Sequence, residues 1–229
     1  MLPVWPWSPI KLPGVVFAYR ASVGATLSGA NVTALADQGP RQISLTSEGA
    51  GNVVLSSNAI GTMPGMTFSA TSKLVNTGVA QLVGNKADRH YFSVTKPVTI
   101  GGALITHPYG GTSNATCYLV NLGGLVYVLE ANRCVTPPTI ANISMVADTS
   151  VASNVVAAAM NGTDLPLNST VKAGEANGVG LIIGSWTTGT SYFQGLVCEV
   201  WMFSRKLTTK EAADVRHYFG NLYGITIAN

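Results

Sequence analysis

The segment 195–203 constrains the fold of this chain more than any other, because its sequence, GLVCEVWMF, is nearly all apolar. A strand with one face in water alternates apolar and polar residues, whereas a strand covered on both faces does not. We therefore expect a strand with packed layers on both sides. Strict alternation would divide its residues between two faces, with Leu196, Cys198, Val200 and Met202 on one and Val197, Glu199, Trp201 and Phe203 on the other.

A helix is predicted directly after this strand, with signals at both of its ends. Thr208 is followed three residues later by Glu211, which is the spacing of a capping box, and Gly224 stands where a glycine ends a helix. An apolar stripe runs between these signals: Ala212, Val215, Tyr218, Phe219 and Leu222. We expect Val215, Phe219 and Leu222 to pack over a sheet edge or over the open end of a sandwich.

Upstream of this unit the chain is a series of short strand-like segments separated by glycine, asparagine and proline. The predicted strands are 15–21, 43–45, 52–55, 66–75, 90–95, 98–106, 117–122, 125–131, 139–148, 155–162 and 179–184. Residues 121–124 and 161–162 offer the best hairpin turns, because asparagine and glycine tolerate positive φ. This spacing predicts an all-β, two-sheet antiparallel sandwich that occupies 14–229 as a single domain.

Residues 1–13 form a separate arm in this interpretation. Four prolines alternate with Trp5 and Trp7, and proline favours an extended, stiff conformation over a helix or a central strand. The two tryptophans are large apolar groups that require a pocket. Two alternatives stay open: the arm folds back onto its own domain, or Trp5 and Trp7 make assembly contacts with a neighbouring subunit.

Composition limits the classes of partner. Only 10% of the residues are charged, against about 25% in an ordinary globular protein. Either the surface is rich in uncharged polar side chains, or much of it is buried against partners. The net charge of +3 is scattered, so nucleic-acid binding is not expected. No signal peptide and no membrane-spanning segment is recognisable. Cys117 and Cys134 could pair across a hairpin, but three cysteines make no disulfide framework, and reduced thiols are the default expectation.

The second half of the chain resembles a known family. VVAAAMNGTDLP at 155–166, VGLIIG at 179–184, GLVCEVWMF at 195–203 and the helix at 205–224 follow one another as in laminin-G-like modules of the concanavalin A-like lectin/glucanase superfamily. A weaker similarity extends to VVFAYRAS and to ALADQ at 34–38. The resemblance implies a jelly-roll sandwich. It implies no activity, because this superfamily contains lectins, glycoside hydrolases and structural modules.

Catalysis is not expected. A glycoside hydrolase needs two carboxyl groups about 5–9.5 Å apart, and the glucanases of the superfamily place theirs as alternating acids on one strand. No such pair occurs here, and Glu199 is interpreted as an internal anchor. His90, His107 and His217 are far apart and are expected to be surface or hydrogen-bonded residues. The sequence predicts no enzyme, no catalytic residue and no cofactor.

Metal binding has equally little support. Oxygen atoms of Asp37, Asp148, Asn161 and Asp164 could serve a loop Ca²⁺, but no calcium-loop motif contains them. We therefore predict no metal site.

A carbohydrate site would need aromatic platforms beside hydrogen-bonding side chains. Tyr109, Trp186, Tyr192 and Phe193 lie in segments rich in glycine and threonine and are the candidate glycan-binding residues. The alternative is that these rings fold onto the edge of the sandwich.

Two functions follow. The first is a non-catalytic structural or interaction protein, most simply a surface component of a bacteriophage virion such as a capsid-decorating or tail-fibre protein. It would be assembled in the host cytoplasm, contact other virion proteins or further copies of itself, and form a homo-oligomer. The alternative is a carbohydrate-binding module that attaches its carrier to a host glycan.

Overall fold

The structure is a computed structural model. It describes residues 7–78, 88–98, 102–109, 112–122, 125–127, 140–153, 155–168, 180–186 and 191–229, and within 107–127 it describes the backbone alone. The predictions for Trp5 and Cys134 lie outside these residues, as do those for the side chains of Tyr109, His107 and Cys117.

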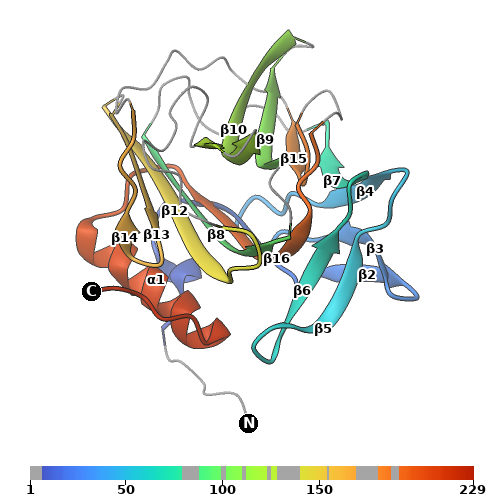
Figure 1. Ribbon diagram of the computed structural model, residues 1–229, viewed down its shortest axis with the longest axis horizontal. Coiled ribbons are helices and arrows are strands. Elements are labelled where there is room, and N and C mark those ends of the chain that lie inside the picture. The colour runs from blue at the N-terminus through green and yellow to red at the C-terminus, as the bar shows by residue number, and fades with distance from the viewer. Residues whose placement is uncertain are drawn as a thin grey trace.

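In the part of the chain that the structure describes, sixteen strands form one continuous sheet in which every neighbouring pair is antiparallel (Figure 1). The ladder between β3 and β5 is a single residue pair, Asn31 with Val54, so the sheet divides there into two half-sheets. The first half-sheet contains β11 (Leu125–Tyr127), β10 (Thr112–Leu122), β9 (Ala103–Tyr109), β15 (Leu181–Ile183), β7 (Ser72–Asn76), β4 (Leu45–Gly49), β3 (Asn31–Leu35) and β2 (Ala25–Ser28). The second half-sheet contains β5 (Val54–Ile60), β6 (Met63–Phe68), β16 (Gly195–Phe203), β8 (Arg89–Pro97), β12 (Met145–Ala152), β13 (Val155–Met160), β14 (Thr163–Asp164) and β1 (Val15–Arg20).

The two half-sheets enclose the main hydrophobic core. Leu45 and Ile105 from the first half-sheet join Met145 and Val200 from the second in one cluster of buried residues. Burying a large apolar side chain contributes roughly 1.5–3 kcal/mol, so this layer is a principal source of stability. The predicted all-β, two-sheet antiparallel jelly-roll sandwich of the concanavalin A-like kind, with one C-terminal α-helix, is thereby confirmed.

Strand β16 lies at the centre of the second half-sheet. One edge pairs with β8, and the other pairs first with β6 and then with β1. Eight of its nine residues are buried, as the apolar sequence predicted. The assignment of residues to faces was wrong, because a register shift between Val197 and Glu199 inserts a bulge at Cys198. As a result Cys198 packs with Trp201 and not with Val200.

The helix α1 (Thr209–Tyr223) has both predicted caps. The Thr208 hydroxyl accepts from the Glu211 backbone N–H at 3.2 Å, and the Thr208 N–H donates to the Glu211 carboxylate at 2.8 Å. Gly224 ends the helix with φ of 68°, a left-handed conformation that glycine adopts without a steric penalty. A short 3-10 helix, Pro9–Lys11, precedes β1.

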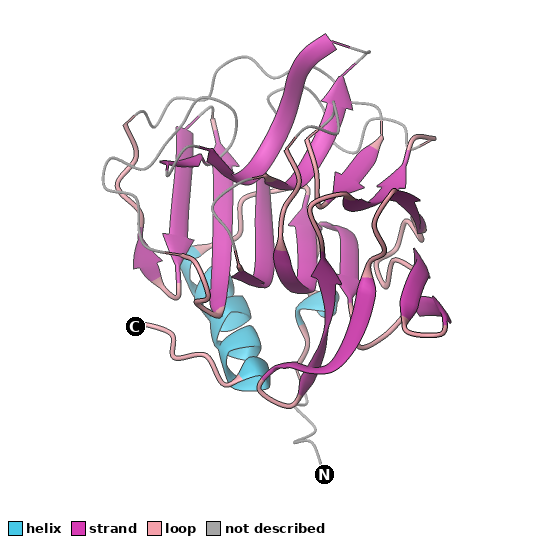
Figure 2. Cartoon of the chain, turned by 45° about the vertical axis from the view of Figure 1, so that its right-hand side comes forward, coloured by secondary structure: helices cyan, strands magenta, loops and turns pink. Residues whose placement is uncertain are grey.

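Helix α1 covers a sheet face, and the expectation that it lies over an edge or an open end is corrected. Val215 and Phe219 join Trp201 and Phe92 in a second buried cluster between the helix and the outer face of the second half-sheet. The rings of Trp201 and Phe219 meet edge to face, with centroids 5.7 Å apart. Both views place α1 and the β9–β10 hairpin at opposite ends of the molecule (Figure 1, Figure 2).

Several predicted strands have other bounds in the structure, and two segments differ in the number of strands that they form. Residues 66–75 were expected as one strand but divide into β6 and β7, because the Ser72 hydroxyl accepts from the Ser69 N–H and closes a turn between them. Residues 25–35, which lie between two of the predicted strands and were not predicted as strand, form the β2–β3 hairpin. The turn at Asn161 and Gly162 is confirmed, since both residues have positive φ and join β13 to β14.

Candidate ligand-binding pocket

The aromatic residues predicted to bind a glycan do not form one platform. Tyr109 ends β9, and its side chain lies outside the described part. Phe193 is 4% exposed and packs edge to face on Phe68 in the main core, so its ring supports the fold from within. This corrects its assignment as a contact residue. Trp186 and Tyr192 are half-buried.

Trp186 and Tyr192 also lie on opposite faces of the two paired segments that carry them, 184–186 and 191–193. Ser185 pairs with Tyr192, while the Trp186 N–H donates to the Ser191 carbonyl at 3.0 Å. Directly opposed residues of an antiparallel pair share a face, and the next pair uses the other face. The two rings therefore cannot hold the same face of one sugar, although each stays a predicted contact on its own.

The arm is described from Trp7 onward. The Trp7 ring is half-buried and meets Tyr218 of α1 edge to face, with centroids 5.9 Å apart. This contact fits the alternative in which the arm folds back onto its own domain. The assembly role of Trp5 and Trp7 stays a prediction.

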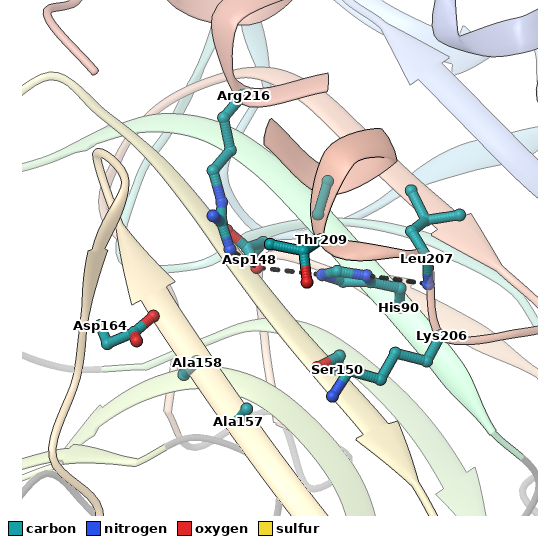
Figure 3. A pocket seen from close by; sticks show the side chains of 11 residues that line it. His90, Asp148, Ser150, Ala157, Ala158, Asp164, Lys206, Leu207, Thr209 and Arg216 are labelled. Atoms are coloured by element: carbon teal, nitrogen blue, oxygen red, sulfur yellow. Dashed lines mark hydrogen bonds and ion pairs between the residues drawn. The ribbon is translucent and has the colours of Figure 1, made fainter. Parts of the chain in front are cut away.

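A pocket of about 250 Å³ opens between the first turn of α1 and the strands β12, β13 and β14 (Figure 3). Its lining has three kinds of side chain. The charged ones are Asp148, Asp164, Lys206 and Arg216, the hydroxyls belong to Ser150 and Thr209, and the apolar ones are Ala157, Ala158, Leu207 and Ala212, with the ring of His90 beside them.

Asp148 and His90 form the rear wall of the pocket. Arg216 donates two hydrogen bonds to Asp148, from Nε to Oδ2 at 2.6 Å and from a terminal nitrogen to Oδ1 at 2.9 Å. His90 Nε2 lies 3.0 Å from Asp148 Oδ1, and the Leu207 N–H donates to His90 Nδ1 at 3.4 Å. Because Nδ1 accepts, the ring carries its proton on Nε2 and donates it to Asp148. The His90 ring also stacks on Phe92, with centroids 4.4 Å apart.

Burial shifts the pKa values of His90 and Asp148 in one direction, and their hydrogen bonds and charged partners shift them in the other. Burial lowers the pKa of His90 below its usual value, against the opposing pull of Asp148. Burial by itself would raise the pKa of Asp148, but the hydrogen bonds from His90 and Arg216 outweigh it and hold that pKa below the usual range. Asp148 is therefore an ionised carboxylate beside a neutral imidazole.

This arrangement does not form a nucleophilic triad. Ser150 lies beside His90 on the neighbouring strand and lines the same pocket. Both nitrogens of His90 already have protein partners, so neither is available to take a proton from the Ser150 hydroxyl.

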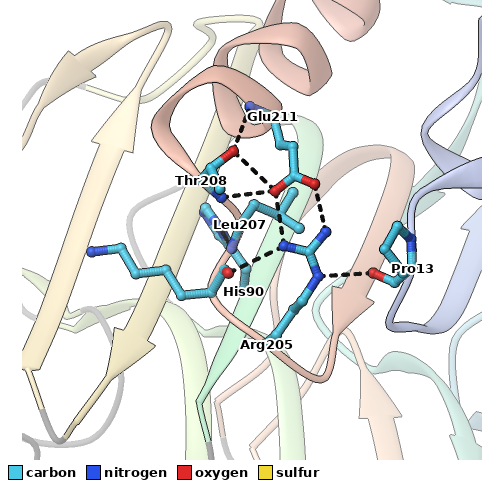
Figure 4. A network of polar contacts seen from close by, with 7 residues as sticks. Pro13, His90, Arg205, Leu207, Thr208 and Glu211 are labelled. Atoms are coloured by element: carbon cyan, nitrogen blue, oxygen red, sulfur yellow. Dashed lines mark hydrogen bonds and ion pairs between the residues drawn. The ribbon is translucent and has the colours of Figure 1, made fainter.

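The segment between β16 and α1 is fixed by a charged clamp (Figure 4). Arg205 donates to both carboxylate oxygens of Glu211, at 2.8 and 2.7 Å, and through Nε to the Pro13 carbonyl at 3.0 Å. The bonds from Arg205, with those from Thr208, lower the pKa of Glu211 to about 2. The clamp holds Leu207 in place where its N–H meets His90, and so fixes one side of the pocket.

A second buried carboxylate, Glu199, lies under the same helix but outside this pocket. It has no exposed surface and accepts from Arg20 Nε at 3.0 Å, Trp201 Nε1 at 2.8 Å and the Tyr223 hydroxyl at 2.8 Å. Burial raises the pKa of Glu199, and the three donors oppose that rise. Glu199 is an anchor, as expected, although its partners are side chains and not backbone amides.

The oxygen donors considered for Ca²⁺ do not converge. Asp37 accepts from the backbone N–H groups of Ala18 and Gly39, at 2.7 and 2.6 Å, and Asn161 accepts from Val146 at 2.8 Å. In the described part of the chain, no group of three or more histidine, cysteine, aspartate or glutamate residues could hold a metal ion.

None of the helices in that part of the chain has the length and apolar character needed to cross a lipid bilayer.

Sequence reasoning considered Asp148 and Asp164 only as oxygen donors to Ca²⁺ and His90 only as a surface or hydrogen-bonded residue, and it missed the pocket that unites the three. Ser150, Lys206, Thr209 and Arg216 were not considered as site residues. One signal was available: Asp148 is the one charged residue of the segment that forms β12, and a charge that a strand buries needs partners.

No family model and no curated protein sequence matches the chain. Solved structures do resemble it. Over 89% of its length the chain superposes on 98% of domain 4 of a GH43 extracellular arabinanase from Geobacillus stearothermophilus in complex with arabinotriose, with 15% identity and a TM-score of 0.60.

The chain also resembles parts of two longer chains. The chain covers 37% of a Trypanosoma rangeli sialidase at 15% identity and a TM-score of 0.59. It covers 51% of the receptor-binding domain of a botulinum neurotoxin C/D mosaic serotype at 9% identity and a TM-score of 0.59. The chain thus spans about half or less of these two. At such identities the likeness shows the β-sandwich fold alone.

Proposed function

We propose that this chain is a non-catalytic carbohydrate-binding sandwich domain. The observation that carries the proposal is the pocket beside α1, in which carboxylates, an ammonium group and hydroxyls surround an apolar floor. Sugar hydroxyls both donate and accept, and sugar C–H faces need apolar surface. A few convergent polar groups over an apolar lining are the general form of a small-ligand site.

The structural likenesses support this proposal. Domain 4 of the arabinanase, which the chain matches over nearly the whole of that domain, was solved with a bound arabinotriose. The botulinum neurotoxin domain is a receptor-binding domain. The resemblance to the sialidase favours an enzyme, but it covers only 37% of that protein.

The geometry of the described acids supports binding over hydrolysis. Asp148 and Asp164 line one pocket, but Asp148 is held ionised by Arg216 and His90 and so cannot act as the general acid of a glycosidase. Glu199 is sealed away from solvent. Glu130 and Glu175 lie outside the described residues.

The experiment is a glycan array on which the intact chain is compared with its Asp164→Asn variant. We expect the chain to bind at least one glycan class, arabinan oligosaccharides among the probes, and the variant to lose that signal. The bound glycan is then incubated with the chain and its products are analysed. A clean negative array would overturn the binding proposal, and cleavage of the glycan would overturn its non-catalytic part.

A second proposal concerns the setting in which the domain works. We propose that it is carried on a bacteriophage virion as a self-associating surface component. The low charge of 10% and Trp7, which stays half-buried beside Tyr218 of α1, support a surface that further subunits cover. Co-purification with large particles, lost on deletion of 1–13, is expected. An unassociated monomer that binds no particle would contradict it.

A further inference from the structure

We infer that the pocket beside α1 holds one uncharged sugar residue at the end of a glycan chain, an inference that rests on the proposed carbohydrate-binding function. It names the ligand class and the mode of recognition: end-on capture of a single residue, and not a groove along a polysaccharide.

The size of the pocket sets the first limit. Pockets that enclose drug-sized ligands measure roughly 300–1,000 Å³, whereas this one measures about 250 Å³. Walls rise on two sides: the first turn of α1 on one and the β13–β14 hairpin on the other (Figure 3). The space fits one sugar ring and leaves no room for a second.

The charges of the pocket set the second limit. Arg216 and Asp148 neutralise each other through two short bonds at the rear. Across the mouth, Lys206 and Asp164 stand on opposite sides (Figure 3). An anion drawn to Lys206 would meet Asp164, and a cation drawn to Asp164 would meet Lys206. A neutral polyol meets neither conflict, because its hydroxyls donate to carboxylates and accept from the ammonium group.

The floor of the pocket suits the C–H face of a sugar ring. Ala157 of β13 presents only a methyl group there, so the depth of the pocket depends on its small size, whereas the methyl group of Ala158 packs in the main core. Ser150 and Thr209 add hydroxyls from the rear strand and the helix. The clamp between Arg205 and Glu211 holds the turn that carries Lys206, so the rim is fixed before a ligand arrives (Figure 4).

The test fills the pocket without touching the core. Ala157→Trp places an indole into the site from an exposed position on β13. Val155→Trp is the matched control, because Val155 lies two residues away on the same face of the same strand, is 51% exposed and does not line the pocket. Thermal melting of both variants checks that they fold.

Binding is measured by calorimetry with an array-positive oligosaccharide and with the methyl glycoside of its terminal residue as competitor. We expect Ala157→Trp to weaken binding at least tenfold, Val155→Trp to leave it unchanged, and the methyl glycoside to compete. The inference is overturned, while the proposed function survives, if the chain binds its glycan but Ala157→Trp binds equally well, or if only chains of several residues compete. An intact chain that binds no glycan overturns both.

Discussion

Two carboxylates are buried beneath the same helix and are satisfied in different ways. Glu199 is enclosed by Trp201 and Tyr223 and has no exposed surface. Asp148 is 3% exposed and forms the rear wall of a pocket that opens to solvent. Both accept from an arginine and from a ring N–H or hydroxyl. The difference lies in the size of the neighbouring side chains. Large aromatic rings shield Glu199 from solvent, whereas small alanine side chains leave the pocket at Asp148 open.

This comparison separates a structural network from a binding one within one layer. The donors around Glu199 come from β1, β16 and α1, so they tie the ends of the chain together. The partners of Asp148 come from β8 and α1 and hold a surface in shape. We therefore expect changes at Glu199 to act on stability alone, and changes around Asp148 to act on stability and binding.

The largest effect is expected at Glu199. Glu199→Leu leaves Trp201 Nε1 and the Tyr223 hydroxyl buried without an acceptor, so the free energy of unfolding should fall by about 3–5 kcal/mol. Urea denaturation measures it. The control is Glu48→Leu, whose pair with Lys73 has an exposed carboxylate and contributes at most about 1 kcal/mol. A Glu199→Leu variant as stable as the control would show that the sealed network is dispensable.

A smaller loss is expected when the open network loses its cation. Arg216→Met leaves Asp148 with His90 alone, at a cost of about 2 kcal/mol, because hydrogen bonds to a charged group contribute about 1.5–3 kcal/mol. Glycan affinity should fall as well. Lys210→Met, which removes an exposed pair with Asp214 on the same helix, should change the free energy of unfolding by about 0.5 kcal/mol or less. Unchanged affinity in Arg216→Met would separate this network from binding.

Acid should weaken the open network through His90. Burial lowers the pKa of His90, with Asp148, Arg216 and Lys206 as the charged groups around it. The unfolded chain takes up a proton as the pH falls through about 6.5, while the folded ring stays neutral until its own lower pKa is reached. Stability is therefore greatest above that pH and declines as the pH drops through this window.

Urea denaturation at a series of pH values measures this decline. His90→Gln should flatten the dependence. A pH profile of wild-type shape in His90→Gln would assign the decline to another group.

The smallest effect is expected at the cap of α1. Thr208→Ala removes the acceptor for the Glu211 N–H and should lower the free energy of unfolding by about 1 kcal/mol. Thr209→Ala is the control: it leaves the cap intact, and because Thr209 lines the pocket it should weaken glycan binding with little change in stability. Equal losses of stability in the two variants would contradict the assignment of the cap to Thr208.

The sequence was sufficient for the parts of the fold that local rules determine. Thr208, Glu211 and Gly224 predict the helix because capping depends on residues within a few positions of each other. The doubly covered strand is predictable because burial on both faces removes alternation. Resemblance of the final strand and helix to a known module then indicated the sandwich.

Prediction from sequence failed for features that depend on contacts between residues far apart in the chain. The bulge at Cys198 depends on the register of β16 against β8, which the local sequence does not encode. The pocket unites His90, Asp164 and Arg216, which are distant in sequence and meet only once the helix crosses the sheet. Loop aromatics such as Phe193 were overvalued, because composition cannot tell a ring that faces solvent from one that fills the core.

The bulge at Cys198 places a thiol where its labelling can report local opening of the structure. It turns the sulfur under α1, where burial raises the pKa of the thiol and removes the reactive thiolate. In a background carrying Cys117→Ser and Cys134→Ser, a thiol reagent can reach this sulfur only when the helix lifts from the sheet. The labelling rate then measures how often α1 opens. A saccharide bound to both α1 and β13 should slow the labelling, because it stabilises the closed position of the helix.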